Sequence, residues 1–146
     1  MKKINSNKNS FSDYVIALHT LVLLYNRQEC MSSTSISENV CTNPVRVREV
    51  LRQLTEKKYV IKKMGKNGGY QFNNNYQNLT LKEIALSLEF EFLKNSWTSG
   101  QNQNYCMISQ GMGKFMENLI YSINDEILNK LNNIKISDVE YKLTKI

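Results

Sequence analysis

The chain has 146 residues, 41% of them hydrophobic and 22% charged, with a formal net charge of +6, which predicts one globular domain with a sizeable core. No run approaches the roughly 20 apolar residues of a membrane span, and the basic N-terminus lacks the apolar core of a signal peptide, so we expect a cytoplasmic protein with no membrane partner. Three widely spaced cysteines and one histidine without a clustered partner, His19, argue against a disulfide framework or a zinc site, and we expect neither metal nor cofactor.

The net charge is concentrated in one segment. Residues 44–66 hold eight basic and two acidic side chains, and the rest of the chain balances 11 basic residues against 11 acidic ones. A concentrated basic segment is typical of proteins that bind a polyanion such as nucleic acid. The alternative interpretation is an ordinary solvated basic face.

The N-terminal third predicts a polar tail and two helices. Residues 1–10 are expected to form a flexible tail. The spacing of apolar residues predicts a helix over 11–26, with Ser12 as its N-cap. A short helix follows over 35–40, where Ser35 is a suitable cap because a glutamate lies three residues further on.

A third helix follows after a tight turn. Asn43 is expected to cap it and Pro44 to occupy its first position, where the missing N–H costs nothing. The helix should run to about residue 57 and bury one face, made of Val47, Val50, Leu51 and Leu54.

Two runs of β-forming residues then flank a glycine-rich sequence. Residues 59–64 and 70–72 predict the strands of a hairpin, and GKNGG at 65–69 predicts its tip. Two helices joined by a short turn make a helix-turn-helix, and a hairpin directly after it makes a winged helix. We therefore predict a mainly α fold with a small β-hairpin wing, and place the winged helix-turn-helix domain at residues 11–92.

The C-terminal part predicts a helix capped by Thr80, a polar loop over 93–111 and a long helix over 112–132. A short last helix, capped by Ser137, completes a region 112–146. The long helix has a broad apolar face that needs a partner surface, either the core of the domain or a second copy. We favour a dimer interface because helix-turn-helix proteins usually bind two half-sites as dimers. The expected interface residues are Met112, Phe115, Met116, Leu119, Ile120, Ile123 and Ile127.

At this point the residues resemble a known family. The stretch TNPVRVREVLRQLTEKKYVIKKMGKNGGYQF is similar to the recognition helix and wing of the Rrf-two family of bacterial winged-helix transcription regulators. Its most specific marks are the TNPVxVRxxLxxL helix and the G-x-x-GGY wing tip. LTLKEIALSLE is similar to the helix after the wing, and YCMISQGM to the cysteine-bearing start of the dimerisation helix. The resemblance is strongest over residues 11–92.

The resemblance implies a dimeric DNA-binding repressor on a palindromic operator, often sensing redox state, iron–sulfur status or a thiol metabolite. Two positions depart from the family pattern. The loop before the dimerisation helix offers Cys106 alone, where cluster-binding members carry three closely spaced cysteines, so we expect a branch without that motif. Lys58 stands where the family usually has a glycine.

Candidate DNA contacts come from the helix-turn-helix and the wing. Residues at the start of the recognition helix should meet base edges in the major groove, where arginine can pair with guanine and valine with a thymine methyl group. Wing lysines should meet phosphates or the minor groove, or else protect an edge strand from aggregation. The candidates are Ser35, Thr42, Asn43, Pro44, Val45, Arg46, Arg48, Arg52, Lys62, Lys63, Lys66, Asn67, Gly68 and Gly69.

Cys106 has two interpretations. It could be a redox or thiol sensor, since a thiolate near a helix N-terminus reacts readily with a small oxidant or thiol, or it could be a small buried hydrophobe. Cys41, in the turn between two helices, is expected to be packed, although its oxidation would disturb DNA binding. Cys30 could pair with a cysteine of a second subunit.

We find no nucleophile–base pair, metal cluster or P-loop, and expect no enzyme. The hypothesis is a sequence-specific, dimeric, redox- or thiol-responsive repressor. The alternatives are the same regulator controlled by a small metabolite in the dimer interface, and a winged helix that binds only protein.

Overall fold

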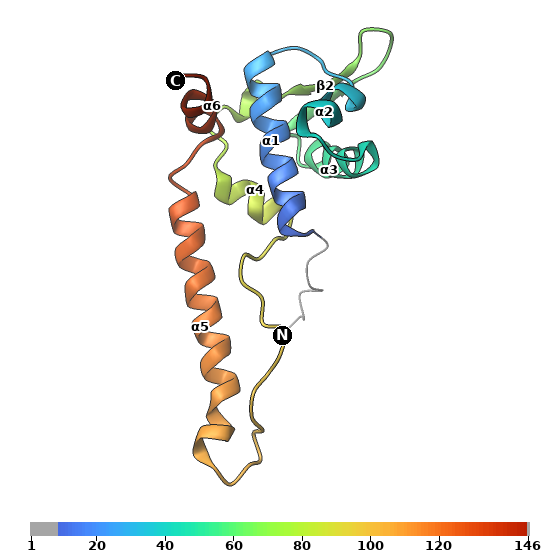
Figure 1. Cartoon of the computed structure of the whole chain (residues 1–146). Coiled ribbons are helices and arrows are strands. Elements are labelled where there is room, and N and C mark those ends of the chain that lie inside the picture. Colours follow the sequence, from blue (N-terminus) through green and yellow to red (C-terminus); the bar gives the residue numbers. More distant parts are fainter. Residues whose placement is uncertain (1–8, 146) are drawn as a thin grey trace. The chain divides into compact units, whose positions relative to one another are not determined.

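The computed structural model describes residues 9–145, so most of the expected tail, residues 1–8, lies outside the described residues. Figure 1 shows a mainly helical chain with one two-stranded hairpin, as predicted. The elements are α1 (Phe11–Arg27), α2 (Ser33–Val40), α3 (Pro44–Glu56), β1 (Val60–Lys63), β2 (Gly69–Phe72), a 3-10 turn η1 (Asn74–Tyr76), α4 (Leu81–Ser87), α5 (Met107–Leu131) and α6 (Ile136–Thr144).

The predicted N-caps of the first two helices are wrong. The cap of α1 is Ser10 and not Ser12: the Ser10 hydroxyl accepts from the Asp13 N–H at 3.2 Å, and the Asp13 carboxylate accepts from the Ser10 N–H at 2.9 Å. This reciprocal capping box needs an acidic residue three positions after the cap, which Ser10 has and Ser12 lacks. Likewise α2 begins one turn earlier than predicted, with Ser32 as its cap in place of Ser35.

Asn9 belongs to the folded unit and not to a tail. Its side chain is only 3% exposed. The Asn9 amide donates to the Leu88 carbonyl at 2.6 Å and to the Gln53 side chain at 2.9 Å, and Gln53 donates back at 3.1 Å. The expected flexible segment therefore ends before Asn9, because this amide links the chain to α3 and to the end of α4.

Helix α3 confirms the prediction at its start and on its buried face. The Asn43 side chain accepts from the Val45 N–H at 2.7 Å, and Pro44 is the first helical residue. The buried residues are the four predicted ones, Val47, Val50, Leu51 and Leu54.

Helix α3 ends in a Schellman motif, in which the residue after the C-cap is left-handed. The Tyr59 N–H donates to the Leu54 carbonyl at 3.1 Å, and the Lys58 N–H donates to the Thr55 carbonyl at 3.0 Å. Lys58 adopts φ = 66° there. A glycine would adopt this left-handed conformation without steric cost. This explains why a glycine, the usual residue of the family at this position, suits the end of the helix.

Of the described residues, 9–90 and 131–145 form one compact unit. Helix α1 lies at its centre and packs against α2, α3, α4, α6 and β2. Helix α6 joins this core through Ile136, whose side chain is fully buried and whose N–H donates to the Leu79 carbonyl at 3.0 Å. The predicted Ser137 cap is wrong, since α6 begins at Ile136 and the Asp138 carboxylate accepts from the Lys135 N–H.

The second unit comprises residues 91–130 and contains most of α5. This helix begins at Met107, five residues earlier than predicted, because the Asn104 side chain accepts from the Cys106 N–H and the Cys106 carbonyl accepts from the Gln110 N–H. The irregular segment before it lies against the helix, with the Asn124 amide paired to both backbone groups of Leu93.

No side chain of α5 is buried in the part of the chain that the structure describes. The predicted interface residues are all partly or largely exposed. Within residues 9–145, no helix is both long and apolar enough to cross a membrane.

Candidate nucleic-acid interface

Strand β2 of the wing is hydrogen-bonded along both of its edges. Strands β1 and β2 pair antiparallel, with Val60 opposite Phe72 and Lys63 opposite Gly69. On the outer side of β2, Met31 and Tyr70 exchange two backbone hydrogen bonds of 2.8 and 2.9 Å. The connection between α1 and α2 thus adds a short third strand segment and anchors the wing to the helix-turn-helix.

The wing tip is a tight turn closed by a hydrogen bond from the Gly68 N–H to the Gly65 carbonyl, 3.0 Å long. Lys66 and Asn67 are the two central residues of this turn and both are exposed. Gly65 has φ = 103°, whereas Asn67 is not left-handed. The turn therefore places Lys66 at the exposed tip of the hairpin.

The other two glycines of the tip are required by close backbone contacts. A Cβ on Gly68 would lie 2.2 Å from the Lys63 carbonyl oxygen. A Cβ on Gly69, where φ is 139°, would lie 2.5 Å from the Met31 carbonyl oxygen. The three glycines of GKNGGY thus fit the turn of this wing and its pairing with Met31.

At the start of α3, the predicted base-reading residues differ in their availability. Val45 is 62% exposed, and Arg48 is also exposed. The Asn43 side-chain oxygen is occupied by its capping bond. Arg46 donates to the Asp13 carboxylate at 2.9 Å and to the Ser12 hydroxyl at 2.7 Å. The guanidinium of Arg46 is therefore tied back to α1 through Nη2, and only its Nη1 and Nε donors are left for a contact with DNA.

The environment of Asp13 favours its charged form. Burial acts to raise the pKa of Asp13, but hydrogen bonds from the Ser10 backbone and from Arg46 outweigh it and hold the pKa below its usual value. Asp13 therefore stays ionised at neutral pH and keeps its pairing with Arg46.

Arg52 lies on the solvent side of α3 between two glutamates. Its Nε and Nη2 donate to the two oxygens of Glu49 at 3.1 and 2.6 Å, and its Nη1 donates to Glu56 at 2.6 Å. These bonds and charges raise the pKa of Arg52. Glu49 was not among the predicted site residues, although its i, i+3 spacing to Arg52 was visible in the sequence.

The remaining predicted cations have no carboxylate within ion-pair distance among the described residues. Lys62 lies with its ammonium 5.6 Å from the centre of the Tyr70 ring. All the predicted DNA-contact residues belong to α2, α3, the turn between them and the wing, which form part of one compact unit. The predicted site cations that are exposed and have no carboxylate partner among the described residues are Arg48, Lys62, Lys63 and Lys66.

The three cysteines are free thiols in different surroundings. Cys106 is exposed directly before α5, and hydrogen bonds from the Ser109 and Ile108 N–H groups lower its pKa. Cys41 is exposed, which contradicts the expectation of a packed residue, because it is the left-handed C-cap of α2 with φ = 62°. Cys30 is half-buried, and its thiol faces the Gln71 side chain at 3.7 Å.

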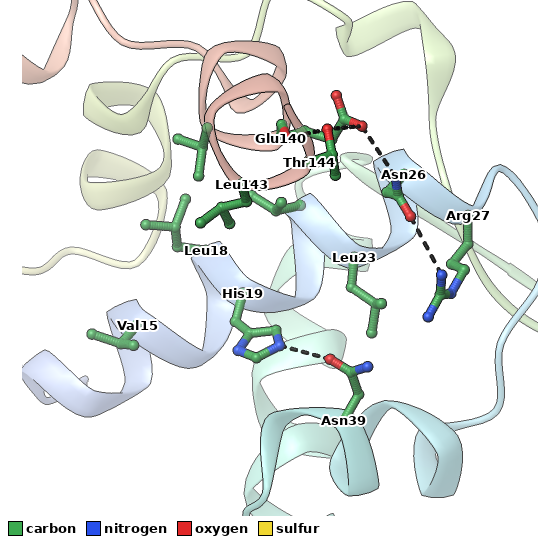
Figure 2. Close-up of a pocket in the computed structure, with 12 residues that line it drawn as sticks. Val15, Leu18, His19, Leu23, Asn26, Arg27, Asn39, Glu140, Leu143 and Thr144 are labelled. Atoms are coloured by element: carbon green, nitrogen blue, oxygen red, sulfur yellow. Dashed lines mark hydrogen bonds between the residues drawn. The ribbon is translucent and has the colours of Figure 1, made fainter. Parts of the chain in front are cut away.

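An open apolar groove of about 340 Å³ lies between α1, α2 and α6. Figure 2 shows its aliphatic lining, with Leu18 and Leu143 between polar groups at the rim. His19 is hydrogen-bonded to the Asn39 side chain at 2.8 Å, and the Glu140 carboxylate accepts from the Asn26 amide at 3.0 Å. The sequence did not predict this groove, because α6 is distant from α1 along the chain.

Residues 11–141 match the sequence profile of Rrf2, the Rrf-two family, which is described as an iron-dependent transcriptional regulator. Within residues 9–145, no three His, Cys, Asp or Glu side chains come together in a way that could hold a metal ion. The described residues therefore do not fit an iron site, and the function that we propose for this protein involves no iron.

Solved structures share the fold over most of the chain. A candidate transcriptional regulator from Lactobacillus plantarum is 19% identical, with a TM-score of 0.76 over 90% of this chain and 89% of that one. CymR (YrzC), the global cysteine regulator of B. subtilis, is 17% identical, with a TM-score of 0.64 over 97% and 98%. The oxidized form of Staphylococcus aureus CymR is 16% identical, with a TM-score of 0.60 over 88% and 93%. Among curated proteins the sequence has no match.

The family profile covers most of the chain, and the solved structures confirm the predicted winged helix-turn-helix. The recognition helix, the anchored wing and the exposed cations are what such a fold needs to bind a duplex. We conclude that the chain belongs to the Rrf2 family of DNA-binding transcriptional regulators, which is a family of regulators and not of enzymes.

Proposed function

We propose that the protein is a dimeric, sequence-specific repressor, acting in the cytoplasm on a palindromic operator, whose DNA affinity responds to an oxidant or a thiol through Cys106. The observation that carries the DNA-binding surface is the set of exposed cations on α3 and the wing. Arg48 and Lys66 have no carboxylate partner among the described residues, so phosphates can neutralise them without breaking an existing ion pair.

The salt dependence of duplex binding tests this surface. Each phosphate contact releases counterions, so Lys66→Ala should weaken binding to every duplex and lower the slope of log K against log salt by about one unit. Lys142→Ala is the matched control, because Lys142 lies exposed on α6, away from the wing. An unchanged slope for Lys66→Ala would remove this residue from the interface. Salt-independent binding would favour a protein-interaction module.

The apolar face of α5 supports a dimer. Leu119 and Ile123 lie on this face, remain more than a third exposed, and follow a helical spacing shared with Met112 and Met116. Leu119→Glu should convert the dimer to a monomer in sedimentation velocity. Tyr121→Glu, on the opposite side of the same helix, should leave the dimer intact. A monomeric wild-type chain at micromolar concentration would refute the proposal.

The position of Cys106 supports the sensing step. Its thiol is exposed, and the backbone N–H groups of the first turn of α5 stabilise the thiolate, which is the reactive form. Hydrogen peroxide would transfer one oxygen to the thiolate sulfur as its O–O bond breaks, and a proton from solvent completes the products, a sulfenic acid and water. The similar structures include CymR proteins, one of which is named a cysteine regulator and one of which was solved in an oxidized form.

The cysteine variants separate the sensing hypotheses. Oxidation should lower the DNA affinity of the wild type, a reductant should restore it, and Cys106→Ser should abolish the response. Cys30→Ser and Cys41→Ser are the controls and should respond like the wild type. If the response persists in Cys106→Ser, the sensor is another cysteine or none.

The alternative is control by a small metabolite. The groove between α1, α2 and α6 favours this alternative, since its volume and its apolar lining with a few polar groups are in the range of small-ligand sites. A metabolite-controlled regulator would keep its DNA response when all three cysteines are replaced by serine, and Leu143→Glu in the groove would remove that response.

A further inference from the structure

We propose that Glu49 is a specificity-determining residue that selects cytosine by accepting a hydrogen bond from the cytosine N4 amino group in the major groove. This inference rests on the proposed DNA-binding function and adds the base that one position of α3 reads.

The position of Glu49 on α3 is the first support. At 100° per residue, Glu49 lies about 160° around the helix from the buried residues Val47 and Leu51. It is in the second turn, directly in line with the exposed Val45 four residues earlier. The side that α3 turns away from the core therefore carries a carboxylate in the N-terminal half, where recognition helices contact base edges.

The second support is the fixed orientation of this carboxylate. Both oxygens of Glu49 are engaged by Arg52 in a fork, through Nη2 at 2.6 Å and Nε at 3.1 Å. Arg52 is held in turn by Glu56 at 2.6 Å. Each carboxylate oxygen has two lone pairs, so one bond to the guanidinium leaves further acceptor capacity. The fork orients the carboxylate along the helix surface, which favours a directed contact with a base edge.

The third support is electrostatic. A single carboxylate approaching a duplex is repelled by the phosphates, and the guanidinium of Arg52, which is shared with Glu56, offsets part of the charge of Glu49. What remains is an oriented hydrogen-bond acceptor. Cytosine presents a donor, N4, with no acceptor beside it in the major groove, whereas guanine presents only acceptors and adenine places the N7 acceptor beside its amino group. Cytosine is therefore the base that this carboxylate favours.

The competing explanation is that the ion pairs only stabilise an exposed helix, where such i, i+3 and i, i+4 pairs contribute a few tenths of a kcal/mol each. The chain offers a matched control for this explanation. Glu56 has the same chemistry, contacts the same arginine and is similarly exposed, at 63% against 54% for Glu49. It is the last residue of α3, about 10 Å further along the helix axis.

The test is selection of bound duplexes from a randomised library by the full chain, with wild type, Glu49→Gln, Glu49→Ala and Glu56→Gln in parallel. The wild type should enrich cytosine at one position of each half-site. Glu49→Gln should shift that position to adenine, because a carboxamide pairs with adenine N6 and N7. Glu49→Ala should reduce the cytosine preference there by roughly tenfold or more, while Glu56→Gln should leave it unchanged.

The outcomes separate this inference from the proposed function. If the wild type enriches a sequence and the Glu49 variants enrich the same one, the inference fails and DNA recognition stands. If Glu49→Gln and Glu56→Gln change the preference alike, Arg52 and not Glu49 is responsible, and the inference also fails. If the wild type enriches no sequence, both fail. Thermal unfolding of Glu49→Gln, which keeps the size of the side chain, verifies that the variant is folded.

Discussion

Replacing Lys58 with glycine should stabilise the protein, because the backbone of Lys58 is left-handed. Lys58 has φ = 66° at the end of α3, in the Schellman motif described above. A residue with a Cβ pays about 1–2 kcal/mol in the left-handed region. Glycine avoids this cost but loses about 0.5–1 kcal/mol through the greater freedom of the unfolded chain. We therefore expect a net gain of about 0.5–1 kcal/mol in the free energy of unfolding.

Thermal unfolding followed by circular dichroism measures this change, which corresponds to a rise in Tm of about 1–4 °C for a chain of this size. Lys57→Gly is the matched control, because Lys57 carries the same charge one residue earlier but has a right-handed backbone, φ = −81°. Its substitution should lower the Tm. If Lys58→Gly fails to raise the Tm, or if both variants change it equally, the left-handed backbone of Lys58 is not the source of strain.

Three further predictions concern the core. Asn9→Ala should lower the free energy of unfolding by about 1–3 kcal/mol in urea titrations, because the Gln53 side chain and the Leu88 carbonyl lose a buried partner. Thr20→Val should raise it by about 1 kcal/mol, since the buried Thr20 hydroxyl has no hydrogen-bond partner among the described residues; a loss would show that the hydroxyl is satisfied. Burial raises the pKa of Tyr14 to about 12. Because the folded state holds this proton more tightly, its contribution is complete below pH 10 and should be lost between about pH 10 and 12, by about 2–3 kcal/mol. Tyr14→Phe should show a shallower alkaline decline than the wild type.

Much of the fold is readable from local patterns. The spacing of Val47, Val50, Leu51 and Leu54, the Asn43–Pro44 start of α3 and the glycines between two β-forming runs each depend on residues a few positions apart. Such signals are local, so the order of helices, turn and wing follows from the sequence, and so does the concentration of positive charge in residues 44–66. The resemblance to the family rests on the sequences of the recognition helix and the wing, and it implies the same winged helix-turn-helix.

Only the tertiary structure decides which of those charges are available to a partner. Arg46 and Arg48 look equivalent in sequence, yet Arg46 is paired with Asp13, which is 33 positions away along the chain. Asn9 lies in a polar segment that the sequence predicts to be a flexible tail. In the folded protein it is buried, and its side chain is hydrogen-bonded to Gln53 and to the Leu88 carbonyl. Likewise α6 follows the long helix α5 in the sequence, but it packs against α1. This packing creates the groove between α1, α2 and α6. Contacts between distant segments depend on how the helices pack, and periodicity and capping patterns carry no information about such packing.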